Sequence, residues 1–375
     1  MSSAEKRARF QRAVSRMTDE AEREFPLLKI EFRPVPEDQN GFLQLYRFTG
    51  KYDTSDPVFA ELKGFTGKNR SSWEVEKAKL WLQENAAIVE EIERIAMLKD
   101  RSLSGDPPGY VGFIKASMVK SAADVMMVKA RLAAEEKDEK LSILYIGAAQ
   151  NLASHLREIE APTLLLETVV IGIDRDICQT VFKNLLPSFG RDADLAKWRS
   201  VLAVRNYNTE ECSKVIRGEW FMMSRFFFPP LLVQGSDELP DPGSFLKYYA
   251  SLVYDRMSWL EGASLAQLQD LEILDEGKIR EVSKKGQEIL KVSAMGVEAW
   301  KKGYCTAVSK MAKYRAALDL LILEKEYPEW SATDMALKAT HEPLSAKPFV
   351  FDAVKRRLSP PPEFAGEMEE IDLPW

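Results

Sequence analysis

A chain of 375 residues with 45% hydrophobic and 29% charged residues has the composition of a globular protein, and it is long enough for two or three domains or one extended helical array. The formal charge of −6 is small and mixed, which argues against nucleic acid as the main partner, because phosphate binding usually needs a basic excess. With only two histidines and three cysteines, a histidine-rich metal site and a Cys-x-x-Cys cluster are disfavoured, so we expect no metal and no cofactor.

The histidines and cysteines are isolated from one another in the sequence. His155 lies within a predicted helix and His341 in a predicted loop, with no second ligand one turn away, so both are expected to be structural. Cys178, Cys212 and Cys305 are an odd number, which leaves at least one thiol free. We expect buried free thiols, and a single disulfide between two of them stays open as an alternative.

The first 70 residues predict a helix followed by extended and loop segments. Residues 4–24 form a highly charged amphipathic helix, without the apolar stretch that a secretory signal requires. The later part of 25–33 alternates like a short strand. Glu37 and Asp38 suit the first turn of a helix that continues through Tyr46, and 51–70 is expected to be loop with a short helix.

The central part of the chain is predicted to be almost continuously helical. A capping-box pattern at 71–74 (Ser-Ser-Trp-Glu) opens one long helix over 75–96, and a Gly- and Pro-rich segment at 105–109 breaks the chain. The further helices are expected at 114–136, 140–159, 163–187, 191–203, 208–228, 243–260, 264–297 (with a break near Gly277 as an option) and 299–326. The most apolar runs, 161–173 and 226–233, are too short to cross a bilayer.

The C-terminal part carries the clearest strand signal. Residues 348–351 form a short apolar run, with 355–358 as the hairpin mate. Residues 359–375 contain acidic residues and prolines but no basic residue, and they are expected to form a mobile tail. Apolar residues between its carboxylates leave a docking peptide as an alternative.

These patterns predict a mainly α fold. We expect a multi-helical antiparallel array, which could be solenoid-like, ending in a small C-terminal β-hairpin; no fixed-period repeat occurs. The expected organisation has four parts. They are an N-terminal helix with an extended and loop segment at 1–70, a multi-helical core domain at 71–326, a short helix plus β-hairpin at 327–358 and an acidic Pro-containing tail at 359–375.

Two carboxylates are the weak catalytic candidates. Glu167 and Glu219 both lie among apolar residues, where a carboxylate must be paired or must shift its pKa. A pair of this kind could perform acid–base hydrolysis if both side chains met in one cleft. The simpler interpretation, which we favour, is that each is structural and is satisfied by a donor on a neighbouring helix.

The densest aromatic stretch, 220–230, supplies the weak binding candidates. It is apolar nearly all round, which is typical of a buried helix or of one that faces a partner. Burial in the core is favoured, and lining of a ligand pocket is the alternative. The candidate residues are Trp220, Phe221, Phe226, Phe227 and Phe228.

Several landmarks, taken together, resemble a group of uncharacterised multi-helical proteins of planctomycete and verrucomicrobial bacteria. The landmarks are Pro34-Val35-Pro36-Glu37-Asp38-Gln39-Asn40, the segments 84–88 and 162–173, Arg217-Gly218-Glu219, and the segments 313–317, 326–330 and 347–351. The resemblance implies a multi-helical fold and a place at the cell envelope, because such proteins usually carry an N-terminal membrane anchor. The chain shows no such anchor or membrane span in its sequence.

The sequence therefore favours a non-enzymatic interaction or scaffold protein associated with the cell envelope, with a protein partner. An enzyme is disfavoured because no catalytic constellation is visible. The alternatives are a hydrolase that uses Glu167 and Glu219, or a small-ligand binding protein with 220–228 lining its pocket. A cytoplasmic location is the alternative to the envelope.

Overall fold

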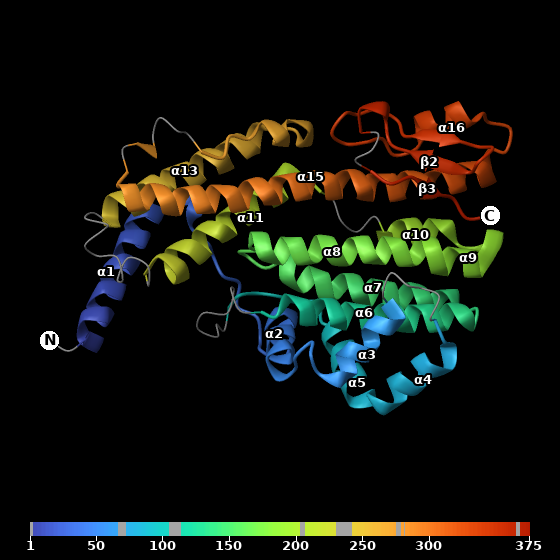
Figure 1. The fold of residues 1–375 in the computed structure, drawn as a ribbon, viewed down its shortest axis with the longest axis horizontal. Coiled ribbons are helices and arrows are strands. Elements are labelled where there is room, and N and C mark those ends of the chain that lie inside the picture. The colour runs from blue at the N-terminus through green and yellow to red at the C-terminus, as the bar shows by residue number, and fades with distance from the viewer. Residues whose placement is uncertain are drawn as a thin grey trace.

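The computed structural model describes residues 3–66, 73–104, 114–202, 207–229, 242–274, 279–280, 282–364 and 368–375. The fold is mainly α, with a small three-stranded antiparallel sheet near the C-terminus (Figure 1), which confirms the predicted fold class. Within the described residues, no helix combines the length and the apolarity needed to cross a membrane.

The N-terminal segment begins with helix α1 (Ser3–Glu24) and the single turn η1 (Pro26–Leu28). The predicted strand in 25–33 is wrong, because residues 29–36 form no ladder. Side chains bind this backbone instead: the Ser102 hydroxyl donates to the Arg33 carbonyl at 2.6 Å, and the Arg33 N–H donates to Glu160 at 3.1 Å. The backbone N–H and carbonyl of Arg33 are thus bound without a partner strand.

Helices α2 (Gly41–Lys51) and α3 (Pro57–Thr66) follow. Helix α2 begins later than Glu37 and Asp38 suggest, because the side chain of Asn40 caps it by accepting from the Leu43 N–H at 3.3 Å.

The predicted long helix over 75–96 is wrong, because it is divided into α4 (Val75–Glu84) and α5 (Ala86–Ala96). Asn85 leaves the helical conformation (φ −110°, ψ 24°), and its side chain donates to the Trp81 carbonyl at 2.8 Å. The N-cap of α4 is Glu74, without a side-chain hydrogen bond. Ser71 and Ser72 of the predicted capping box, and the predicted break at 105–109, lie outside the described residues.

Three successive antiparallel helices form the centre of the molecule (Figure 1). They are α6 (Ala116–Glu135), α7 (Glu139–Arg157) and α8 (Leu164–Thr180). Helix α8 continues through a π turn, η3 (Val181–Leu185), into α9 (Leu186–Phe189), the turn η4 (Gly190–Asp192) and α10 (Leu195–Leu202).

Helix α11 (Thr209–Met222) and its π turn η5 (Met223–Phe227) lie beside α13 (Pro242–Gly262). The turn η6 (Leu265–Asp270) follows α13. The predicted helix over 264–297 is therefore wrong in its first part: η6 is a 3₁₀ turn and 271–274 are not helical. The Lys301 ammonium donates hydrogen bonds to the carbonyls of Gln269 and Leu271, both at 3.1 Å. These carbonyls therefore have a hydrogen-bond partner without forming an α-helical turn.

Helix α15 (Lys284–Glu326) is 43 residues long and runs along most of the molecule (Figure 1). It passes without a break through 297–299, where two helices were expected to meet. Along its length the helix contacts η6, α8, α10, α16 (Ala332–Lys338) and β3 of the sheet.

The sheet contains β1 (Val350–Asp352), β2 (Arg357–Ser359) and β3 (Ile371–Asp372) in that order, and the turn η7 (Pro362–Phe364) lies between β2 and β3. The pairing of Phe351 with Leu358 confirms the predicted hairpin. The prediction of a mobile tail is wrong, because β3 pairs with β2 and the side chains of Met368, Ile371 and Leu373 are buried. The tail docks on its own chain, where its carboxylates also pair with Arg357.

Candidate functional site

Helix α13 has an aromatic layer on one face and a cavity on the other. On the buried face, Tyr249 stacks on Trp220 of α11, with ring centroids 5.9 Å apart, and Phe245 meets Phe228 edge-on at 5.0 Å. Aromatic pairs of this kind add to the free energy gained from burying their area. The aromatic stretch after residue 220 therefore fixes the position of α13.

The five predicted binding residues do not line the cavity. Trp220, Phe221 and Phe228 are buried, Phe226 packs against Phe221 at 5.8 Å, and Phe227 is 45% exposed. Trp220 and Phe228 are core residues that contact α13 through Tyr249 and Phe245, whereas Phe227 is on the surface.

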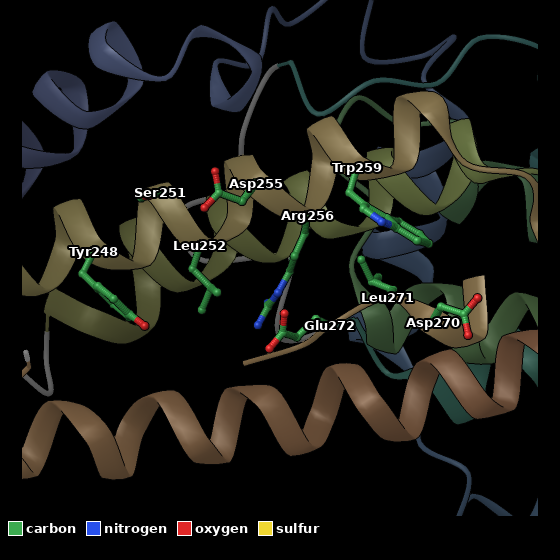
Figure 2. Close-up of a pocket in the computed structure, with 9 residues that line it drawn as sticks. All are labelled: Tyr248, Ser251, Leu252, Asp255, Arg256, Trp259, Asp270, Leu271 and Glu272. Carbon is green, nitrogen blue, oxygen red and sulfur yellow. The ribbon is translucent and has the colours of Figure 1, made fainter. Parts of the chain in front are cut away.

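The cavity lies between α13, the end of η6 and the segment that follows η6 (Figure 2), and its volume is about 330 Å³. This volume falls at the lower end of the range of small-molecule pockets, roughly 300–1,000 Å³. The lining residues are Tyr248, Ser251, Leu252, Asp255, Arg256, Trp259, Asp270, Leu271 and Glu272.

Arg256 forms the floor of this cavity. Its side chain extends from α13 toward the segment that contains Glu272 (Figure 2), and the residue is only 4% exposed. The Nε atom is buried without a hydrogen-bond partner, and burial lowers the pKa of the guanidinium. Across the described part of the chain, no carboxylate forms an ion pair with Arg256. An uncompensated buried cation is costly, so this arginine is available to an anion.

The rim of the cavity is acidic. Asp270 and Glu272 come from the wall opposite α13, Asp255 comes from α13 itself, and all three carboxylates are exposed. Figure 2 shows Glu272 on the same side as the Arg256 guanidinium and Asp255 turned away from it. The site thus combines one buried cation with three exposed carboxylates.

The wall that carries Asp270 and Glu272 is held by α15. Lys301 is 7% exposed, and its ammonium binds the carbonyls of Gln269 and Leu271 and pairs with Glu298 at 3.0 Å. Because its donors are used by these groups, Lys301 positions the wall and does not compete with Arg256 for a ligand.

Glu219, a predicted catalytic candidate, binds the N-terminal end of α8. Its carboxylate accepts from the backbone N–H of Leu164 at 2.7 Å, in the first turn of α8. Burial raises its pKa to about 7, against the effect of this hydrogen bond. The neighbouring Gly218 permits the approach, because a Cβ atom there would lie 1.9 Å from the carbonyl oxygen of Pro162. Two landmarks of the resemblance, 162–173 and Arg217-Gly218-Glu219, therefore contact each other.

Glu167, the second catalytic candidate, belongs to what we call the polar core cluster, which comprises Arg157, Glu167, Asp174, Tyr207 and Glu211. The Nε atom of Arg157 lies 3.2 Å from a Glu211 oxygen and 3.8 Å from a Glu167 oxygen. Burial raises the pKa of Glu167 to about 8, although Arg157 acts in the opposite direction. The Arg157 guanidinium also lies over the Tyr207 ring, 5.3 Å from its centroid.

The other end of the polar core cluster is closely packed. The Tyr207 hydroxyl donates to Asp174 at 3.1 Å, and burial raises the pKa of Asp174 to about 7. A cavity of about 20 Å³ borders Asp174, Tyr207 and Arg315, which is the size of a single water molecule. Glu167 and Glu219 thus have different partners, and neither lines this small cavity or the cavity at α13.

Sequence reasoning missed Arg256. The signal was present, because Leu252, Val253, Trp259 and Leu260 surround it at helical spacings of three and four. The pattern places a permanently charged side chain on an apolar helix face, where it needs either a partner or a ligand.

Among the residues that the structure describes, no group of three or more His, Cys, Asp or Glu side chains could hold a metal ion. The three cysteines are free and buried, as expected from the sequence. Comparison of the chain with protein-family models, curated proteins and solved structures gives no match.

Proposed function

We propose that this protein binds a small molecule with a carboxylate or similar anionic group in the cavity at α13. The observation that carries the proposal is the buried guanidinium of Arg256, which has no carboxylate partner in the described chain and extends into a cavity of about 330 Å³. Arginine presents a planar fork of donors that matches a carboxylate in two parallel hydrogen bonds.

The energetics support the same assignment. A buried arginine that serves the fold is normally held by carboxylates, because an unpaired buried charge lowers stability. A ligand anion would supply the missing partner and would itself be desolvated in a cavity lined by Leu252, Trp259 and Leu271. Binding would therefore relieve a cost that the unliganded fold carries.

The test is titration of 3-phenylpropanoate, a carboxylate with an apolar ring, into the full chain, followed by calorimetry. Hydrogen bonds to charged groups contribute about 1.5–3 kcal/mol, so Arg256→Met should weaken binding about 10- to 100-fold. Arg356→Met is the matched control, because Arg356 is bound by both Glu324 oxygens at 2.9 Å and does not line the cavity. Equal affinity of the Arg256→Met variant and the wild type would refute the proposal.

The expectations of a protein partner and of a cell-envelope location stay predictions. The first rests on the long helices, the lack of a catalytic constellation in the sequence and the resemblance, and the second on the resemblance; they are tested by cross-linking and by cell fractionation. The hydrolase alternative receives less support, because Glu219 binds the first turn of α8 while Glu167 lies beside Arg157. That alternative would be supported if Glu167→Gln and Glu219→Gln each abolished a hydrolytic activity of the protein.

A further inference from the structure

We infer that the ligand of the cavity at α13 is zwitterionic: a free amino acid with an apolar side chain, whose carboxylate binds Arg256 and whose ammonium group binds the acidic rim. This inference rests on the proposed function, because it assumes that Arg256 anchors a carboxylate in this cavity.

The inference rests on where the charged side chains of the cavity lie and on how exposed they are. The nine lining residues include one basic side chain, Arg256 on the floor, and three acidic ones, Asp255, Asp270 and Glu272. The acidic side chains are exposed whereas Arg256 is buried, so an incoming anion meets negative charge before it reaches the guanidinium. A ligand that carries only negative charge is repelled at the rim, and one that also carries an ammonium group is attracted there.

The wall opposite α13 supplies the carboxylates for the ammonium group. Asp270 and Glu272 stand on either side of the buried Leu271, whose carbonyl is bound by Lys301. Both therefore project from a segment that α15 holds in place. Asp255 is turned away from Arg256 (Figure 2), so it contributes to the potential at the rim without facing the anchor.

The apolar part of the lining fits the side chain of such a ligand. Leu252 and Leu271 lie on either side of Arg256 along the cavity, and Trp259, 36% exposed, stands at one end of it (Figure 2). An aromatic ring at this place offers an apolar surface and attracts cations at its face. The carboxylate and the ammonium group of an amino acid are attached to the same carbon, so they suit Arg256 and Glu272, which lie on the same side of the cavity (Figure 2). The apolar lining suits the side chain of the ligand.

The experiment compares L-phenylalanine with 3-phenylpropanoate, which lacks the amine, on the full chain by calorimetry. Exposed ion pairs contribute about 0.2–1 kcal/mol each, so two rim contacts should make phenylalanine bind roughly 2- to 30-fold more tightly. In the double variant Asp270→Asn/Glu272→Gln this preference should disappear, and 3-phenylpropanoate should bind more tightly than it does to the wild type. The control Asp38→Asn/Glu61→Gln makes the same charge change at exposed positions outside the cavity and should keep the preference.

The outcomes separate the inference from the function on which it rests. If both compounds bind equally and both depend on Arg256, the zwitterion is refuted and the carboxylate site stands. The zwitterion is also refuted if the preference for phenylalanine survives in the double variant. If neither compound binds the wild type, or if both bind the Arg256→Met variant unchanged, the proposed function fails and the inference fails with it.

Discussion

Arg157 and Arg256 are buried to nearly the same extent, at 7% and 4% exposure, but their surroundings are opposite. Arg157 lies within ion-pair distance of Glu167 and Glu211, and it lines neither cavity. Arg256 has no carboxylate partner in the described chain and borders the much larger cavity at α13. The difference shows that burial of a charge does not itself mark a functional site; what matters is whether the fold already provides the counter-charge and fills the space.

The largest expected effect is on the paired arginine. Arg157→Met leaves the carboxylate of Glu211 without its cation, and loss of one partner of a buried ion pair typically costs about 3–5 kcal/mol. Chemical denaturation at pH 7 measures the change in the free energy of unfolding. A variant as stable as the wild type would mean that the polar core cluster contributes nothing to the fold.

The opposite sign is expected for the unpaired arginine. Arg256→Met replaces a buried charge by an apolar side chain of similar length, so it should raise the free energy of unfolding by about 1–2 kcal/mol. The same denaturation experiment measures this, with Arg356→Met as the paired comparison that should lower stability. If Arg256→Met destabilises the protein as Arg157→Met does, the contrast between the two arginines is wrong.

The smallest expected effect is a pH dependence that comes from Glu167. Its pKa is raised from 4.5 to about 8 in the folded state because burial disfavours the charged form. The folded protein therefore holds this proton more tightly than the unfolded chain does, and the stability it contributes at pH 4.5 is lost as the pH rises toward 8.

The test compares the wild type with Glu167→Gln in denaturation curves between pH 5 and pH 8. The decline with pH should be shallower in the variant, because glutamine has no proton to lose over this range. Some decline should persist, because burial raises the pKa of Asp174 and of Glu219 in the same direction. Parallel curves for the two proteins would show that Glu167 is ionised in the folded state at pH 5.

The helices that follow a local apolar pattern were predicted correctly from the sequence. The prediction was wrong where a segment is held by a side chain from another part of the chain. Helices α1, α6 and α7 follow the apolar spacing expected at 4–24, 114–136 and 140–159. By contrast, Lys301 binds the carbonyls of the segment predicted as helix at 264–297, and Arg357 pairs with the tail expected to be mobile. These partners are far away in the sequence, so no local window contains them.

The candidate site was predictable only in part. The sequence identified Glu167 and Glu219 as buried carboxylates, but it could not show that their partners are Arg157 and the first turn of α8. It identified the aromatic stretch after residue 220 as apolar on all sides, and those residues form the layer behind the cavity. The cavity itself depends on the approach of η6 to α13, which no sequence periodicity encodes.

The position of α15 late in the chain has a consequence for synthesis on the ribosome. Its middle part covers α8 and η3: the Met311 sulfur lies 3.6 Å from the Cys178 sulfur, and Tyr314 packs on Phe182 of η3 with ring centroids 5.1 Å apart. Helices α6 to α8 leave the ribosome well before this cover exists, so nascent chains expose the apolar face of α8 until α15 has been made. Such a delay is the condition under which a growing chain aggregates or requires a chaperone, and truncation before residue 284 would make it permanent.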